Sequence, residues 1–127
     1  MKRKRPKPLT KAELRIMEAL WRARQATVAE VVAAIGKPPL AYTTVLTMLR
    51  ILEQKGVVAR EAAGRAHVYH PLVERDDAAS SAVTDILGAF FADRKTALAL
   101  QLMAQEHPTD DELDEIRALI ARYEENG

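Results

Sequence analysis

The chain has 127 residues, of which 48% are hydrophobic and 29% are charged, a composition typical of a globular protein rather than a disordered one. It contains no cysteine, which excludes disulfides, thiolate metal sites and a cysteine nucleophile. The net charge of +1 hides a division, because residues 1–71 carry fourteen Lys and Arg against five Asp and Glu, whereas residues 72–127 carry five against thirteen. This pattern predicts one half that faces a polyanion and one half that faces water or protein.

Residues 1–8 contain five cations and two prolines, the composition of a flexible basic arm. Such an arm either contacts phosphates or serves only as a solubilising tail, and the sequence favours neither. Prolines follow the basic start where a signal peptide has an apolar segment, and no apolar run approaches the ~20 residues of a membrane span. We therefore expect a cytoplasmic protein.

Three helices are expected between residues 10 and 55. The pairs Thr10–Glu13 and Thr27–Glu30 have the spacing of capping boxes, which start the first two helices. Gly36 ends the second helix, and a third helix runs from Tyr42 to Lys55 and ends at Gly56. The apolar stripes expected to face the core are Leu14, Ile16, Met17, Leu20 and Trp21 (the largest anchor) in the first helix, Val31, Val32 and Ile35 in the second, and Val45, Leu49 and Leu52, flanked by Met48, in the third.

The pattern then changes to that of short strands. Residues 57–61 and 66–70 contain β-branched or aromatic side chains, and the glycine-containing residues 62–65 join them. They predict a two-stranded hairpin. Three helices followed by a hairpin are typical of a winged helix-turn-helix, which is a DNA-binding module. The predicted fold class is therefore mainly α, with a small β-hairpin wing.

The remaining chain is predicted to be helical, with segments 75–92 and 94–106 and a last helix started by a capping box at Thr109–Glu112. About 55 residues in three amphipathic helices cannot easily bury their apolar faces alone, so we expect a homodimer. The predicted domains are the arm 1–8, a winged-helix domain 9–71 and a helical dimerisation domain 72–127. The expected dimerisation residues are Phe90, Phe91, Leu98, Leu102, Ile116, Leu119 and Ile120.

Signatures of catalysis and metal binding are absent from the sequence. Ser80 and Ser81 lie in a helical pattern without a G-x-S-x-G elbow, and there is no Gly-rich phosphate loop. His67 and His70 are three apart in a strand, so they point to opposite faces. We therefore expect neither an enzyme nor a metal or cofactor site.

The outer face of the third helix carries polar side chains with no acid among them. At about 100° per residue, Thr43, Thr47, Arg50 and Gln54 lie opposite the apolar stripe of the same helix. Hydroxyls, an amide and a guanidinium can bond base edges and phosphates, whereas a merely solvated face would mix Glu with Lys. The pattern predicts double-stranded DNA as a partner. The alternative is a winged-helix module that docks a protein instead.

Several motifs closely resemble the BlaI/MecI/CopY penicillinase-repressor family. They are Leu-Arg-Ile-Met-Glu-Ala-Leu-Trp at 14–21, Thr-Val-Ala-Glu-Val at 27–31, Ala-Tyr-Thr-Thr-Val-Leu-Thr-Met-Leu at 41–49, Lys-Gly at 55–56 and Gly-Arg-Ala-His-Val-Tyr-His-Pro at 64–71. The resemblance, over roughly residues 9–125, implies a homodimeric repressor that binds a pseudo-palindromic operator with TACA/TGTA-like half-sites. It also implies DNA contacts by Tyr42, Thr43, Thr44 and Thr47 of the recognition helix and by Arg65 of the wing.

The chain departs from this family in three respects. The copper-responsive branch has a C-terminal cysteine cluster, which this chain lacks, so copper sensing through thiolates is excluded. The antibiotic-responsive branch is cleaved by a membrane-bound sensor protease at an Asn-Phe bond, and the nearest match here, Gln101-Leu102, does not reproduce that bond. Asp93 and Arg94 stand where many relatives have a glycine-rich turn. The inducing signal therefore stays open.

Overall fold

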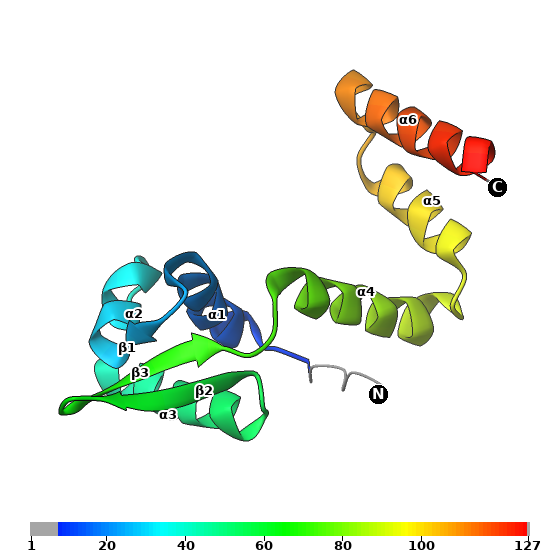
Figure 1. The fold of residues 1–127 in the computed structure, drawn as a ribbon. Coiled ribbons are helices and arrows are strands. Elements are labelled where there is room, and N and C mark those ends of the chain that lie inside the picture. Colours follow the sequence, from blue (N-terminus) through cyan, green and yellow to red (C-terminus); the bar gives the residue numbers. More distant parts are fainter. Residues whose placement is uncertain (1–7, 127) are drawn as a thin grey trace. The chain divides into compact units, whose positions relative to one another are not determined.

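The computed structural model describes residues 8–126, which form two compact units, one ending at Thr84 and one beginning at Asp85 (Figure 1). Apart from Pro8, the predicted basic arm lies outside the described residues. The first unit contains α1 (Lys11–Ala23), β1 (Ala26–Thr27), α2 (Val28–Ile35), α3 (Tyr42–Gln54), β2 (Val58–Ala63), β3 (Ala66–Pro71) and the first part of α4 (Arg75–Phe91). The second contains the rest of α4, α5 (Lys95–Gln105) and α6 (Asp110–Asn126).

All three predicted capping boxes are formed. The hydroxyl of Thr10 accepts a hydrogen bond from the backbone N–H of Glu13 at 3.1 Å, and the carboxylate of Glu13 accepts one from the N–H of Thr10 at 2.8 Å. The same reciprocal bonds join Thr27 to Glu30 and Thr109 to Glu112. Each box satisfies amides that the first turn of a helix leaves without partners. The starts of α1, α2 and α6 are therefore determined by local sequence.

The wing is larger than the predicted hairpin. β2 and β3 stay paired as far as Ala63 opposite Ala66, so the turn is only Gly64 and Arg65, with Gly64 in the left-handed region at φ 64°. A third strand, β1, pairs antiparallel with β3 and places β3 in the centre of the sheet (Figure 1). The sequence did not predict β1, because two residues are too short to show an alternating pattern.

The core of the first unit joins its first three helices to the sheet. Ten large side chains are almost completely buried, namely Ile16, Met17, Leu20, Val31, Val45, Leu49, Leu52, Val57, Val58 and Tyr69. The predicted buried stripe of α3 is confirmed, with Met48 packed at its edge. Val32 and Ile35 of α2 are also partly buried against this core. This packing leaves the opposite side of α3 exposed.

The prediction for α1 was wrong at two positions. Leu14 is 39% exposed, and Trp21 is only partly buried, so it is not the main anchor of the core. The buried stripe instead includes Glu13, which is 4% exposed and lies three residues before Ile16. A carboxylate in this position was not expected. Leu14 lies at the edge of the stripe because its own angular position on the helix is more than about 100° from that of Ile16.

The start of α4 belongs to the first unit because it contacts α1. The indole N–H of Trp21 donates a hydrogen bond of 2.8 Å to the carbonyl oxygen of Val73. The guanidinium of Arg75 lies 5.4 Å from the centroid of the Trp21 ring and also pairs with Glu18. These contacts hold the beginning of α4 against α1. The functional boundary that we placed after Pro71 stays a prediction.

The turn between α4 and α5 is formed without glycine. Ala92 and Asp93 both adopt positive φ angles, 49° and 63°, which is uncommon for residues with a Cβ. The backbone N–H of Asp93 donates to the carbonyl of Leu87 at 3.0 Å, and that of Arg94 donates to Phe91 at 2.9 Å. These bonds satisfy carbonyls at the end of α4. The turn that differs from the family pattern is thus still a tight one.

Candidate nucleic-acid interface

The helix α3 has two distinct faces. Its inner face is anchored in the core by Val45, Leu49 and Leu52, each 0% exposed. The side chains that we predicted to contact DNA from this helix are all exposed, and they are Tyr42, Thr43, Thr44, Thr47, Arg50 and Gln54. The outer face of the helix carries Thr43, Thr47, Arg50 and Gln54, and its first turn exposes Tyr42 and Thr44. A rigid helix presents side chains to a groove more accurately than a loop does.

The two threonines on this face are linked through the helix backbone. The hydroxyl of Thr47 donates a hydrogen bond of 2.9 Å to the carbonyl oxygen of Thr43, one turn earlier. In this arrangement the hydroxyl proton of Thr47 is used within the helix, while the side chain itself stays exposed and its oxygen keeps lone pairs for a further bond. Such a side chain can accept a hydrogen bond from a base amino group or pack against a thymine methyl.

The first turn of α3 differs from those of α1, α2 and α6. Its N-cap residue is Ala41, which makes no side-chain capping bond, and no acidic residue lies in the turn. Protein side chains therefore do not cap the first amides, and the positive end of the helix dipole is not neutralised. The hydroxyls of Tyr42, Thr43 and Thr44 lie in the same turn. Backbone amides and side-chain hydroxyls can together donate hydrogen bonds to a phosphate oxygen.

The wing adds cationic side chains. Arg65 is exposed in the turn between β2 and β3. Arg60 on β2 forms an ion pair of 3.3 Å with Glu53, which is the one carboxylate in the sequence of α3. This pair neutralises Glu53 and links the strand to the helix. The sequence alone does not predict this ion pair, since the pairing depends on how β2 packs.

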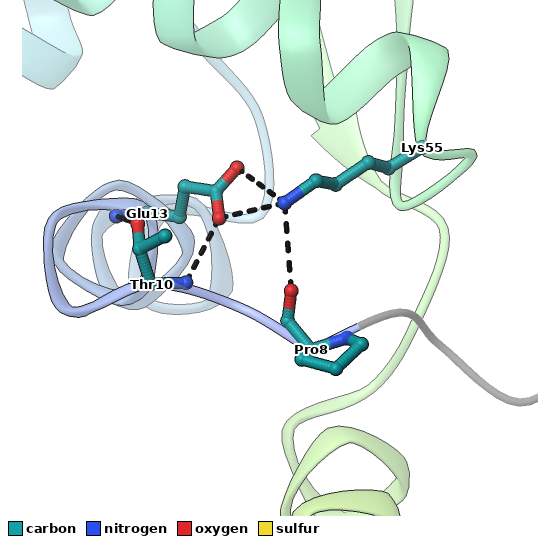
Figure 2. A network of polar contacts seen from close by, with 4 residues as sticks. All are labelled: Pro8, Thr10, Glu13 and Lys55. Carbon is teal, nitrogen blue, oxygen red and sulfur yellow. Dashed lines mark hydrogen bonds and ion pairs between the residues drawn. The ribbon is translucent and has the colours of Figure 1, made fainter.

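A partly buried ion pair lies at the C-terminal end of α3. Lys55, the C-cap of this helix, places its Nζ 2.9 Å from both carboxylate oxygens of Glu13 in the first turn of α1 (Figure 2). The same nitrogen donates a longer bond, 3.4 Å, to the carbonyl of Pro8. The sequence assigned Glu13 only to a capping box, and no local pattern indicates a partner 42 positions away.

The pKa of the Glu13 carboxyl is lower than its ordinary value of 4.5. Burial by itself raises this pKa, but hydrogen bonds from the Thr10 backbone and from Lys55, with the positive charge of Lys55, lower it by more. A carboxyl whose pKa is lowered by folding stabilises the folded state at neutral pH. That stabilisation is lost as the pH falls from 4.5 through the folded-state pKa.

We therefore predict a pH-dependent effect of Glu13→Gln. At pH 7 the variant should unfold at a lower temperature than the wild type, because Lys55 loses its charged partner. The difference between the two melting temperatures should shrink as the pH falls below 4.5, where the wild-type carboxyl also becomes neutral. Thermal unfolding between pH 7 and pH 3 measures it. A difference that stays constant over this range would contradict the assignment.

Two features are absent from the part of the chain that the structure describes, namely a metal-binding cluster and a membrane-spanning helix. Between Pro8 and Asn126, no group of three or more His, Asp or Glu side chains is arranged to hold a metal ion. Over the same residues, no helix has both the length and the apolar character needed to cross a bilayer.

The second unit carries an apolar surface. Among described residues 85–126, none is fully buried. Of the side chains that we predicted to form a dimer, Phe90 (79%), Leu102 (59%), Ile120 (52%) and Leu119 (43%) are exposed, and Phe91, Leu98 and Ile116 are partly buried. A hollow of about 810 Å³ between α5 and α6 includes Leu102 and Ile116 in its lining. The unit thus exposes most of the apolar side chains that should hold it together.

Comparisons with known proteins match this architecture. The family model of the penicillinase repressor matches residues 9–122. The transcriptional regulator BlaI of Mycobacterium tuberculosis is 34% identical over 114 residues, covering 88% of this chain and 82% of that protein. The penicillinase repressor of Bacillus licheniformis is 22% identical over 116 residues, covering 91% of each. The solved DNA-binding domain of the repressor BlaI superimposes with a TM-score of 0.51 at 30% identity, covering 60% of this chain and 93% of that domain.

The family model spans nearly all of the described chain, so the likeness is not confined to one motif. The structural match covers the winged-helix part and confirms the predicted fold class. Members of this family are transcriptional repressors, which confirms the prediction that the chain is not an enzyme. The chain therefore belongs to the penicillinase repressor family of DNA-binding transcriptional repressors.

Proposed function

We propose that this repressor binds a pseudo-palindromic operator as a homodimer, with α3 of each subunit in a major groove. The observation that carries the proposal is the two-sided character of α3, in which a fully buried apolar face lies opposite an exposed polar face. Glu53 is its one carboxylate, and Arg60 neutralises it. A helix with this character can approach DNA without electrostatic repulsion.

The residues on this surface have different proposed roles. Thr43, Thr47 and Gln54 contact base edges, because hydroxyl and amide groups can form directional bonds there. Arg50 contacts the phosphate backbone from the same face of α3, as does Arg65 from the wing. Tyr42 and Thr44 bind a phosphate together with the uncapped amides of the first turn.

The proposed dimer is supported by the apolar surface of the second unit. Exposure of Phe90, Leu102 and Ile120 is costly in water, because each buried side chain of this size contributes about 1.5–3 kcal/mol. A second copy of the same unit has the same surface and can cover it by twofold symmetry. Twofold symmetry also matches two half-sites of a palindrome. We place the protein in the cytoplasm, where operator DNA is found.

Two alternatives are not part of the proposal. A winged-helix module that docks a protein would not need the excess of positive charge in residues 1–71.

A sensor protease would have to reach the Gln101-Leu102 bond on α5. Leu102 is exposed in the single chain but belongs to the apolar surface that the dimer covers.

Alanine substitutions on α3 test the proposed reading surface. The operator is first identified by sequencing DNA fragments that the protein selects from a random pool. Thr43→Ala and Thr47→Ala should each weaken operator binding by about 1–3 kcal/mol and leave binding to a scrambled duplex nearly unchanged. Arg50→Ala should weaken binding to both duplexes. It should also reduce the slope of log affinity against log salt concentration by about 1, because one phosphate contact is lost. Fluorescence titration on both duplexes measures each effect.

Thr84→Ala is a matched control. Thr84 is exposed on α4 and donates a hydrogen bond of 2.9 Å to the carbonyl of Ser80, as Thr47 does to Thr43. The control therefore removes the same group in the same local geometry, and it should leave operator binding unchanged. Equal losses of affinity on both duplexes for Thr47→Ala would mean that Thr47 contacts the phosphate backbone of the DNA and not a base. No loss on either duplex, for Thr43 and Thr47 alike, would reject α3 as the reading helix.

A further inference from the structure

The ion pair between Glu13 and Lys55 connects two elements that are distant in sequence. Glu13 lies in the first turn of α1 with a side chain 5% exposed, and Lys55 follows the last residue of α3 with a side chain 24% exposed. The ammonium nitrogen lies 2.9 Å from each carboxylate oxygen (Figure 2). The pair thus joins the N-terminal end of α1 to the C-terminal end of the proposed reading helix.

The polar atoms of this pair are satisfied within the protein. The Nζ of Lys55 contacts both oxygens of Glu13 and, at 3.4 Å, the carbonyl of Pro8, and an ammonium has three N–H donors. One oxygen of Glu13 also accepts the backbone N–H of Thr10 at 2.8 Å. Lys55 therefore directs its donors inward, although it lies directly after Gln54 on α3. Its geometry is not that of a side chain that holds a phosphate.

A partly buried ion pair of this kind can fix orientation even where its net contribution to stability is small, although removing one partner alone destabilises the fold. Removing a carboxylate and an ammonium from water costs several kcal/mol, which their attraction only about repays. The apolar residues Val45, Leu49 and Leu52 hold α3 against the core, but hydrophobic contact has no preferred direction. The contact between the Lys55 ammonium and the Glu13 carboxylate adds one specific polar link between the end of α3 and the start of α1.

We infer that Glu13 and Lys55 are positioning residues for operator recognition, which together fix the orientation in which α3 presents its polar face. Neither residue contacts DNA in this role. The inference rests on the proposed function, in that α3 is the helix that reads the operator. Without the pair, α3 stays packed on the core, but Thr43 and Thr47 no longer meet the base edges in register.

Four variants test the inference. Glu13→Gln removes the negative charge and keeps an oxygen for the capping box. Lys55→Met removes the ammonium and keeps an unbranched apolar side chain. The third variant combines both changes. Each single variant should lower operator affinity about 2- to 30-fold, the range for residues that act without touching the ligand, and leave scrambled-duplex affinity unchanged. The double variant should lose no more operator affinity than either single variant does, because both changes remove the same interaction. The fourth variant, Lys55→Arg, should retain the wild-type preference for the operator.

Val31→Ala is the control for stability, because Val31 is fully buried in α2 and lies outside the ion pair. All titrations are made well below the unfolding temperature of the least stable variant. If Val31→Ala loses as much operator preference as Glu13→Gln, stability alone explains the effect and the inference is wrong. Should Glu13→Gln fail to fold, Lys55→Met still provides the test, since it leaves the capping box of α1 intact.

Two further outcomes overturn the inference and differ from a failure of the proposed function. If Lys55→Met weakens binding to both duplexes while Glu13→Gln weakens neither, Lys55 is a phosphate contact. If neither variant changes the operator preference while Thr47→Ala does, α3 reads the operator without help from the pair. If Thr43→Ala and Thr47→Ala also have no effect, it is the proposed function that fails.

Discussion

Replacing Ile120 by glutamate is expected to convert the proposed dimer into a monomer and to lower operator affinity about 100-fold or more. Ile120 is 52% exposed on α6, and the proposed dimer covers it. A carboxylate there would have to lose its hydration without gaining a partner. Two linked half-site contacts raise apparent affinity by about 10²–10⁴ over one, and a monomer loses this gain. Sedimentation should show a mass that falls from about twice 14.1 kDa to 14.1 kDa.

Ala118→Glu is the matched control for this prediction. Ala118 is exposed on the same helix, two residues before Ile120, which places it on the far side at about 100° per residue. This variant should remain a dimer with unchanged operator affinity. A monomer in both variants would indicate that α6 is generally intolerant of charge. A dimer in the Ile120→Glu variant would refute the proposed interface.

Replacing Leu49 by alanine is expected to reduce the free energy of unfolding of the first unit by about 2–5 kcal/mol. Leu49 is 0% exposed in the centre of the α3 stripe, so its removal leaves a cavity among the residues that anchor the reading helix. This is a large part of the ~5–15 kcal/mol that stabilises a typical domain. Urea unfolding followed by the fluorescence of Trp21, the single tryptophan, reports on this unit alone.

Ile51→Ala provides the comparison within the same helix. Ile51 is 40% exposed, so its truncation removes fewer contacts and should cost less than half as much as the change at Leu49. Equal losses at the two positions would mean that α3 is not packed as the structure shows. The pair of variants therefore checks which side of α3 faces the core, independently of any DNA measurement.

Much of the candidate DNA interface was predictable because it depends on one regular helix. The period of 3.6 residues separated Leu49 and its stripe from Thr43, Thr47 and Arg50, and the structure has this division. The pairing of Glu53 with Arg60 was not predictable. It depends on the register of β2, which a sequence pattern of six residues does not determine.

The sequence by itself determined the features of this protein that arise between near neighbours in the chain. The capping boxes at Thr10, Thr27 and Thr109 start helices through bonds over three residues, and Gly36 and Gly56 follow helix ends with φ near 80°. These local signals agree with the apolar periodicity. Together they were enough to predict the winged-helix order and, with the family motifs, a repressor.

Only the tertiary structure decided the contacts between residues distant in sequence. It paired β1 with β3, buried Glu13 against Lys55 across 42 positions, and bonded Trp21 to Val73 across 52. A carboxylate on the core stripe of α1 is unfavourable unless an ammonium lies beside it, and no local pattern reveals that partner. Hydrophobic periodicity shows which face of a helix is buried, but packing alone decides what that face meets.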